Sequence, residues 1–363
     1  MKKFPDIFII IIVLLLLVIG VTTIYNALAL YRTNSTGGFF FNYLAIIGLS
    51  IAACIVCIFV DLSFVERIAP YVALGILIAL VVVLVPFIGR KVGGSRRWIP
   101  FIMFTIQPSE AAKLGLVAYL AALFTRKGEK MTMFSKGFLP PFIVSILFAF
   151  FIMLEPDIGT ALLIIAVVFG MFFFAGTPVV YLVSTALVSL PLFYLLISGK
   201  AYVWYRIVGF LNPWDRKSAE GYHLVQSFKS FALGGFTGSS MEGLLERTVS
   251  LPAATTDFIF AVIAQKAGFL GCTAVVLLFL AFLIRGLHVV KHTEDTFRQN
   301  LAFGIVFMIV VQAFLNILVV VGLVPTTGMT LPFISYGNNS LVITMAMVGL
   351  LLNISRTASE TEQ

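Results

Sequence analysis

Long apolar runs separated by short polar segments make up most of this chain. A helix needs roughly 20 mainly apolar residues to cross a membrane, and about ten runs approach that length. The pattern predicts an all-α polytopic membrane protein of about ten transmembrane helices, with residues 1–363 forming a single transmembrane domain. The predicted spans are residues 8–28, 43–60, 71–88, 110–125, 138–154, 160–175, 179–197, 259–284, 301–323 and 340–354.

The strongest interruption is a polar segment of about residues 198–258, between the seventh and eighth predicted spans. Loops of this length are usually functional. Its scattered aromatic residues predict short amphipathic pieces that lie on the outer leaflet of the membrane. Residues 89–107 and 324–339 are also irregular and are expected on the same face. Three such segments predict a shared outer cavity beneath this large extracytoplasmic loop.

Composition and charge set the orientation. The chain is 60% hydrophobic and only 11% charged, which excludes a water-soluble globular protein. Basic residues precede the first span and recur at 126–136 and 285–298. The positive-inside rule places these segments and both termini in the cytoplasm. The first span is too long for the core of a signal peptide, so we expect it to remain as a helix.

The predicted outer loops are also basic, and the chain has a net charge of +8. A cationic outer face suits lipid phosphates or an anionic substrate, whereas simple anchoring at the interface is the alternative. Cys54, Cys57 and Cys272 lie in apolar runs and are interpreted as small core residues. The three histidines form no ligand cluster with carboxylates, so no metal site made by the protein alone is predicted.

A second polar feature opens the fourth predicted helix, where Gln107 precedes Pro108, and Glu110 and Lys113 lie three positions apart. Residues at that spacing share a helix face and can pair. The pair holds the helix in place, or it keeps a lysine near the outer surface to meet a phosphate. Glu155 and Asp157 flank a proline in a tight outer turn, where they bind a cation or cap the next helix.

Residues 324–339 read as irregular backbone at membrane depth, which must line a cavity or be buried in protein. Gln312 and Asn316 lie one turn apart on the preceding helix and are expected to form hydrogen bonds across helices.

Asp257 is the strongest candidate for chemistry, because it lies where the long polar loop meets a hydrophobic run. A carboxylate at a membrane boundary is costly to desolvate and is therefore a functional candidate. Its apolar surround, Phe258 and Phe260, is expected to raise its pKa toward the range of a general base. The alternative is that Asp257 caps the helix that follows.

The ordered set of motifs resembles the SEDS family (FtsW, RodA and SpoVE), the membrane glycosyltransferases of bacterial peptidoglycan, over essentially the whole chain. Some features look more like the FtsW branch than the RodA branch. The motifs are Gly94-Ser95-Arg96-Arg97-Trp98, Gln107-Pro108-Ser109-Glu110 with Lys113, Pro156-Asp157, Asn212-Pro213-Trp214, Gly221-Tyr222, Gln226-Ser227, Leu251-Pro252, Thr256-Asp257-Phe258, Pro325-Thr326-Thr327-Gly328 and Ser335-Tyr336-Gly337.

The resemblance implies a lipid II polymerase on the outer face of the bacterial cytoplasmic membrane, with Asp257 as the catalytic base of an inverting reaction. It implies that Arg96, Arg97 and Lys113 meet the charge of the leaving group, and that Gln107, Glu110 and Ser335 belong to the same substrate site. A divalent cation, Mg²⁺ or Mn²⁺, is expected on the diphosphate. The implied partner is a class B penicillin-binding protein that crosslinks the product, alongside other membrane proteins of wall synthesis.

Several positions depart from the family pattern. Ala253, Ala254 and Thr255 stand where Glu-Ala-His is usual, and Asn338 replaces a glycine. Gln265 and Lys266 replace a paired glutamate. Two other functions therefore stay open: a lipid-linked precursor flippase or transporter, and a catalytically weak scaffold of the division machinery. The concentration of ionisable residues at the predicted outer face favours the enzyme over the flippase.

Overall fold

The computed structural model describes residues 5–30, 36–92, 95–101, 104–199, 201–215, 221–239 and 255–358. Its elements are α1 (Ile7–Leu30), α2 (Thr36–Phe59), α3 (Leu62–Val82), β1 (Arg90–Val92), β2 (Ser95–Phe101), β3 (Phe104–Ile106), α4 (Pro108–Lys127), η1 (Gly128–Thr132), η2 (Phe134–Phe138), α5 (Leu139–Leu154), α6 (Ile158–Phe174), α7 (Val179–Ser198), α8 (Ala201–Leu211), α9 (Tyr222–Gly234), α11 (Ile259–Lys291), α12 (Thr296–Val321) and α13 (Asn338–Ala358).

Each of the ten predicted spans overlaps one of these helices, and the prediction of an all-helical membrane protein is confirmed. Within the described residues, seven helical segments are long and apolar enough to cross a membrane. They are α1, α2, α3, α5 with the turn before it, α11, α12 and α13. The segments Ile158–Phe174 and Val179–Ser189 are apolar but shorter. The remaining predicted span, α4, carries Glu110 and Lys113 near its start.

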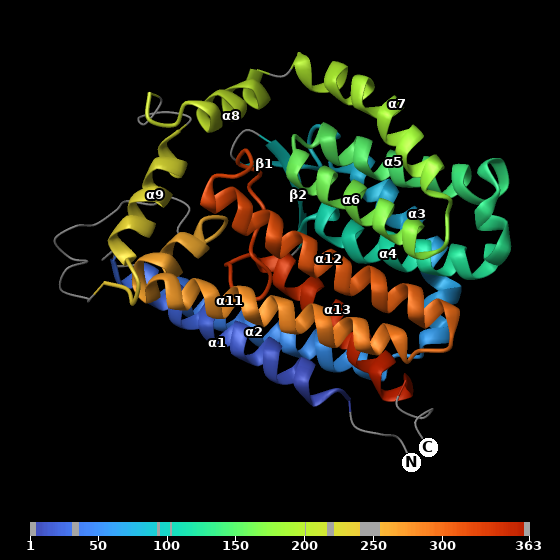
Figure 1. The fold of residues 1–363 in the computed structure, drawn as a ribbon, viewed down its shortest axis with the longest axis horizontal. Coiled ribbons are helices and arrows are strands. Elements are labelled where there is room, and N and C mark those ends of the chain that lie inside the picture. Colours follow the sequence, from blue (N-terminus) through green and yellow to red (C-terminus); the bar gives the residue numbers. More distant parts are fainter. Residues whose placement is uncertain are drawn as a thin grey trace.

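The helices form two groups on either side of a central pair (Figure 1). Helices α4, α5 and α6 lie together on one side, α1, α2 and α11 lie on the other, and α12 and α13 run between them. Helix α12 packs against α4, α6, α11 and α13, and most of its length is buried. This central position lets polar residues on α12 reach segments from both groups.

Both ends of the described chain lie at the same end of the molecule (Figure 1). The Asp6 amide donates a hydrogen bond of 3.0 Å to Ser355 Oγ, close to the end of α13. Arg285 Nε lies 2.9 Å from Asp6 Oδ2, which ties the start of α1 to α11. Two termini on one side require an even number of membrane crossings.

The third helix was predicted over residues 71–88, and that placement is wrong. Helix α3 begins at Leu62, where the Asp61 side chain accepts a hydrogen bond of 3.0 Å from the Ser63 amide. It runs through Pro70 and ends at Val82. Charged Glu66 and Arg67 lie in its first turns, so hydropathy alone placed its start too late.

Residues 89–107 were predicted as an irregular loop, but much of this segment is a small antiparallel sheet of order β1-β2-β3. Arg90 pairs with Trp98, and Ile99 pairs with Ile106. This segment is therefore ordered by backbone hydrogen bonds, and it presents Arg97 from a strand rather than from a loop.

Short amphipathic pieces were predicted in the long segment after α7, and its described residues include the helices α8 and α9, which arch over one side of the bundle with α7 (Figure 1). Ser227 Oγ donates a hydrogen bond of 2.7 Å to the Val320 carbonyl, which fixes α9 on α12. Where this segment passes α11, a Cβ on Gly234 would lie 1.8 Å from the Ala264 carbonyl oxygen, so only glycine permits the approach. The motif Leu251-Pro252 and residues Ala253 and Ala254 lie outside the described residues.

Helix α11 is kinked at Gly268, which has φ 61° and ψ −156°. The backbone partners lost at the kink are replaced from the segment after α9. The Phe269 amide donates 3.0 Å to the Gly235 carbonyl, and the Ser239 amide donates 3.1 Å to the Gln265 carbonyl. Positive φ favours glycine, so Gly268 allows α11 to bend around the end of α9.

Candidate functional site

Residues 255–257 are held by three consecutive carbonyl hydrogen bonds. The Tyr336 amide donates 2.7 Å to the Thr255 carbonyl, and Ser335 Oγ donates 2.6 Å to the Thr256 carbonyl. Asn316 Nδ2 donates 2.8 Å to the Asp257 carbonyl. The irregular segment 324–337 and the C-terminal part of α12 therefore fix the backbone that carries Asp257.

Residues 329–335 of the segment after α12 are almost all buried, which is one of the two outcomes that the sequence predicted for irregular backbone at this depth. Met329, Leu331, Phe333 and Ile334 are all buried. Asn316 Nδ2 also donates 2.7 Å to the Met329 carbonyl, and the Leu331 amide donates 2.8 Å to Ser335 Oγ. Asn316 was predicted to bond across helices, but its two bonds go to backbone outside helices, and its amide joins the Asp257 backbone to this segment.

The Asp257 carboxylate is half-buried and lies in a cavity wall. Its Oδ1 accepts a hydrogen bond of 2.7 Å from Thr256 Oγ1. The capping alternative is wrong, because the cap of α11 is Phe258 and it has no side-chain capping bond. Capping therefore does not engage the carboxylate, which faces the cavity.

This cavity has a volume of about 430 Å³, which lies within the range of about 300–1,000 Å³ typical of small-molecule sites. Its wall comes from α8, α9, the start of α11 and the segment after α12. The lining residues are Tyr205, Arg206, His223, Asp257, Phe258, Thr326 and Gly328.

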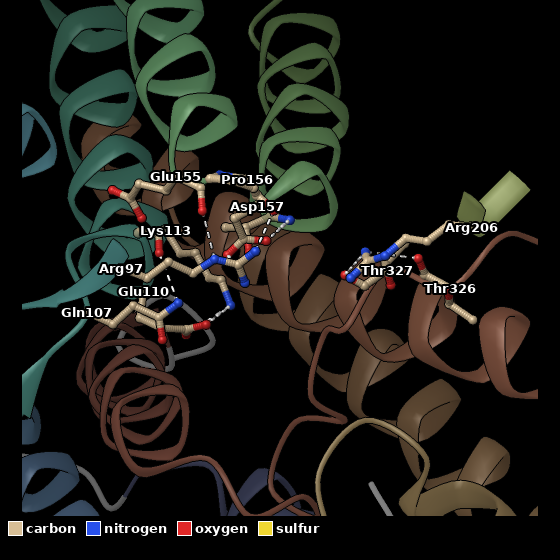
Figure 2. A network of polar contacts seen from close by, with 12 residues as sticks. Arg97, Gln107, Glu110, Lys113, Glu155, Pro156, Asp157, Arg206, Thr326 and Thr327 are labelled. Carbon is tan, nitrogen blue, oxygen red and sulfur yellow. Dashed lines mark hydrogen bonds and ion pairs between the residues drawn. The ribbon is translucent and has the colours of Figure 1, made fainter. Parts of the chain in front are cut away.

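Of these lining residues only Asp257 was predicted as a site residue, and Tyr205, Arg206 and His223 come from the helices of the long segment after α7. Arg206 Nη1 donates hydrogen bonds of 3.2 Å and 3.3 Å to the carbonyls of Thr326 and Thr327 (Figure 2). It thereby joins α8 to the segment after α12 beside Asp257. Nothing in the spacing of Arg206 and Asp257 along the chain indicates this neighbourhood, because it depends on how α8 returns over the bundle.

A second polar cluster lies at the start of α4 (Figure 2). Lys113 Nζ lies 2.8 Å from Glu110 Oε1 and donates 3.0 Å to Gln312 Oε1. Gln312 Nε2 donates 2.9 Å to the Thr330 carbonyl. The predicted Glu110–Lys113 pair and the predicted cross-helix role of Gln312 are confirmed. Lys113 is only 2% exposed, so this cluster connects α4 through α12 to the segment that supports Asp257.

The turn between α5 and α6 meets β2 next to that cluster (Figure 2). Arg97 Nε donates 2.8 Å to the Glu155 carbonyl, and its Nη2 donates to the Pro156 carbonyl. Arg97 Nη1 also lies 3.8 Å from Asp157 Oδ2. Asp157 caps α6 by accepting a bond of 3.2 Å from the Thr160 amide, which confirms the predicted capping.

Glu155 is the most unusual titratable group of this turn, because it is fully buried. Neither carboxylate oxygen has a hydrogen-bond partner of good geometry among the described residues. Burial, and then the neighbouring Asp157, raise the pKa of Glu155 from 4.5 to about 8, although Arg97 and Ser109 act to lower it. At neutral pH much of this carboxyl is therefore protonated.

The predicted site residues fall into two neighbourhoods. Arg97, Gln107, Glu110 and Lys113 gather around the α5–α6 turn (Figure 2). Ser335 lies instead in the segment after α12, next to the backbone that carries Asp257. Its hydroxyl donates a hydrogen bond to the Thr256 carbonyl and accepts one from the Leu331 amide. Arg96 precedes Arg97 on β2, and successive strand residues point to opposite faces, so Arg96 is turned away from the α5–α6 turn.

A second cavity of about 620 Å³ opens between α2, the start of α4 and the start of α13. One part of its lining is apolar, and another part carries the side-chain amides of asparagines and of Gln107. The lining residues are Asn42, Ala45, Ile46, Leu49, Thr105, Ile106, Gln107, Ala111, Tyr336, Asn338, Asn339, Val342 and Ile343.

Among the described residues, no group of three or more His, Cys, Asp or Glu side chains lies close enough together to hold a metal ion.

Comparison with known proteins gives one consistent result. The chain is 37% identical over 355 residues to the probable peptidoglycan glycosyltransferase FtsW of Geobacter metallireducens, covering 96% of this chain and 94% of that protein. It is 36% identical over 360 residues to stage V sporulation protein E of Bacillus subtilis, covering 98% of each. A chain in a solved peptidoglycan synthase complex has the same fold, with a TM-score of 0.81, 24% identity and 98% of each chain covered.

The family model described as cell cycle protein, which unites FtsW, RodA and SpoVE, matches residues 6–360. The family model matches nearly the whole chain, and the relatives are 36–37% identical over almost their full length, so both comparisons indicate the same family. This chain belongs to the FtsW/RodA/SpoVE family, known as the SEDS family.

Proposed function

We propose that this protein is a peptidoglycan glycosyltransferase that polymerises lipid II into glycan strands on the outer face of the bacterial cytoplasmic membrane. The observation that carries the proposal is the Asp257 carboxylate, which faces a cavity of about 430 Å³ while its backbone is fixed by Asn316. A rigid backbone and an accessible carboxylate are what a general base requires. The names of the relatives support the reaction class.

Asp257 acts as the base in this proposal. It takes the proton from the 4-hydroxyl of the acceptor N-acetylglucosamine as that oxygen attacks the anomeric carbon of the donor N-acetylmuramic acid. The bond from that carbon to undecaprenyl diphosphate breaks, and the configuration at the carbon inverts. The proton ends on Asp257, and the electron pair of the broken bond leaves with the diphosphate.

The leaving diphosphate needs positive charge nearby. Arg97 and Lys113 supply part of it from the α4 neighbourhood, although both already have protein partners. They act as fixed charges that set the local potential, and Arg206 adds a third in the Asp257 cavity. When bound, a divalent cation such as Mg²⁺ or Mn²⁺ would neutralise the diphosphate, held by its oxygens together with protein groups.

We place both termini in the cytoplasm, because the two ends lie on one side and the basic segments flank the same ends of the helices. The Asp257 cavity then opens toward the outer face, where lipid II carries its sugars. A class B penicillin-binding protein is the proposed partner that crosslinks the product. The peptidoglycan synthase complex that shares this fold supports such an assembly.

The test is polymerisation by the purified protein, alone and with its cognate class B partner, given fluorescent lipid II and a divalent cation. Glycan length is read on a gel. We expect a ladder of polymers from the complex. No polymer from a folded complex with its true partner would overturn the enzymatic function and leave the scaffold, whereas movement of labelled lipid across vesicles without polymerisation would identify a flippase.

A further inference from the structure

His223 occupies the wall of the Asp257 cavity but has no assigned role. It is the second residue of α9, and its ring stacks on Phe258 with centroids 5.5 Å apart and planes 23° apart. Phe258 follows Asp257 directly and is only 1% exposed. The imidazole therefore rests on the residue next to the proposed base.

The position of His223 is set by contacts on both sides of it. A Cβ on Gly221 would lie 2.4 Å from the Pro213 carbonyl oxygen, so the start of α9 is pressed against the end of the preceding segment. Ser227, one turn after His223, bonds to the Val320 carbonyl on α12. A side chain between two such anchors, with its ring stacked on a buried phenylalanine, is pre-organised.

The two ring nitrogens of His223 have different surroundings. Nδ1 is buried and has no hydrogen-bond partner among the described residues. Burying an N–H without an acceptor is costly, so Nδ1 is the nitrogen without a hydrogen. The hydrogen-bond donor of the ring is then Nε2, on a side chain that lines the cavity.

No hydrogen bond joins this Nε2 to any residue that the structure describes, Asp257 included. Oδ1 of Asp257 accepts instead from Thr256. The cavity thus brings together a carboxylate acceptor and an N–H donor that do not bond to each other. A sugar hydroxyl or an acetamido carbonyl offers the oxygen that such a donor needs.

We infer that His223 is a positioning residue, whose Nε2–H holds an oxygen of the acceptor sugar while Asp257 removes the proton from the attacking hydroxyl. The inference rests on the proposed glycosyltransferase function and extends it to the acceptor side of the cavity. In this arrangement His223 donates a hydrogen bond, and Asp257 takes the proton.

Two variants separate the N–H donor from the aromatic ring. His223→Phe keeps a ring to stack on Phe258 and removes the donor, whereas His223→Gln keeps N–H donors and removes the ring. Both are tested in the complex with the class B partner, with lipid II as the varied substrate. Equal melting temperatures in detergent show that each variant is folded.

We expect His223→Phe to raise the KM for lipid II about tenfold with little change in kcat, as expected when one hydrogen bond of uniform binding is lost. We expect His223→Gln to stay within about threefold of the wild type. A wild-type KM for His223→Phe, or an equal rise in KM for both variants, would overturn the inference in favour of a structural ring. An inactive wild type would instead show that the glycosyltransferase function itself is wrong.

Discussion

Asn316 donates a hydrogen bond of 2.8 Å to the backbone carbonyl of Asp257, which lies 59 residues earlier in the chain. The same amide nitrogen donates 2.7 Å to the Met329 carbonyl. One side chain near the C-terminal end of α12 thus holds together the segment that carries the proposed base and the segment that supports it.

Removing the Asn316 side-chain amide should make the position of Asp257 less fixed. Asn316→Ala leaves two buried carbonyls without their donor, so we expect a loss of about 1–3 kcal/mol in the free energy of unfolding. We also expect a fall in kcat, because Asp257 is no longer fixed. Asn300→Ala is the matched control, since Asn300 is buried on the same helix and its amide bonds to the Thr296 carbonyl of its own helix. A similar kcat for the two variants would argue against the positioning role of Asn316.

The buried Lys113–Glu110 pair should behave as a unit. Lys113→Met leaves the Glu110 charge buried without its partner, and we expect destabilisation of about 3–5 kcal/mol. Adding Glu110→Gln removes that uncompensated charge and should recover part of the loss. Thermal unfolding of the two single variants and the double variant gives the coupling between them. A double variant no more stable than Lys113→Met would contradict the pairing.

Glu155 predicts a specific pH dependence of stability. The pKa of Glu155 is about 8 in the folded protein, against an ordinary value of 4.5 for the unfolded chain. Between pH 4.5 and about pH 8 the folded protein therefore keeps a proton that the unfolded chain has lost. Stability contributed by this group therefore falls as the pH rises from about 4.5 to about 8. The slope is at most about 1.4 kcal/mol per pH unit.

Glu155→Gln removes this titration while keeping a neutral side chain of similar size. We expect the variant to melt at a higher temperature than the wild type at pH 8.5, with the difference closing toward pH 5. Melting curves of both proteins across this range give the answer. A difference in melting temperature that stays constant with pH would show that Glu155 is not the titrating group.

Removal of divalent cations should abolish polymerisation, and Mg²⁺ or Mn²⁺ should restore it. Since the described residues contain no three-ligand cluster, we expect little binding of the cation to the protein alone and tight binding only with the lipid diphosphate. Titration calorimetry with and without a diphosphate lipid tests this. Full activity in the presence of a chelator would contradict a role for the cation.

Much of the fold could be predicted from the sequence, because membrane helices are encoded in local apolar runs. The local pairs were also predictable, since Glu110 and Lys113 lie three positions apart and Asp157 precedes the helix that it caps. Helix α3 was misplaced because Glu66 and Arg67 lower the hydropathy of its first turns. The small sheet was missed, although Gly93-Gly94 between its first two strands is a hairpin signal.

The candidate site was only partly predictable. Gln312 lies 199 positions from the lysine that it contacts, and Arg206 lies 120 positions from Thr326. Such contacts follow from the packing of α12 and from the return of α8 and α9 over the bundle. No local sequence pattern predicts either arrangement. His223 was noticed only as a histidine without a ligand cluster, because its stacking partner Phe258 is distant in the sequence.

The most direct test of the account is the rate of lipid II polymerisation by Asp257→Asn in the complex with the class B partner. This variant keeps the size of the side chain and the backbone bond from Asn316 but cannot act as a base. We predict a rate at least about 10²-fold below that of the wild type, the lower end of what a general base contributes, with an unchanged melting temperature. A rate within a few-fold of the wild type would contradict Asp257 as the base.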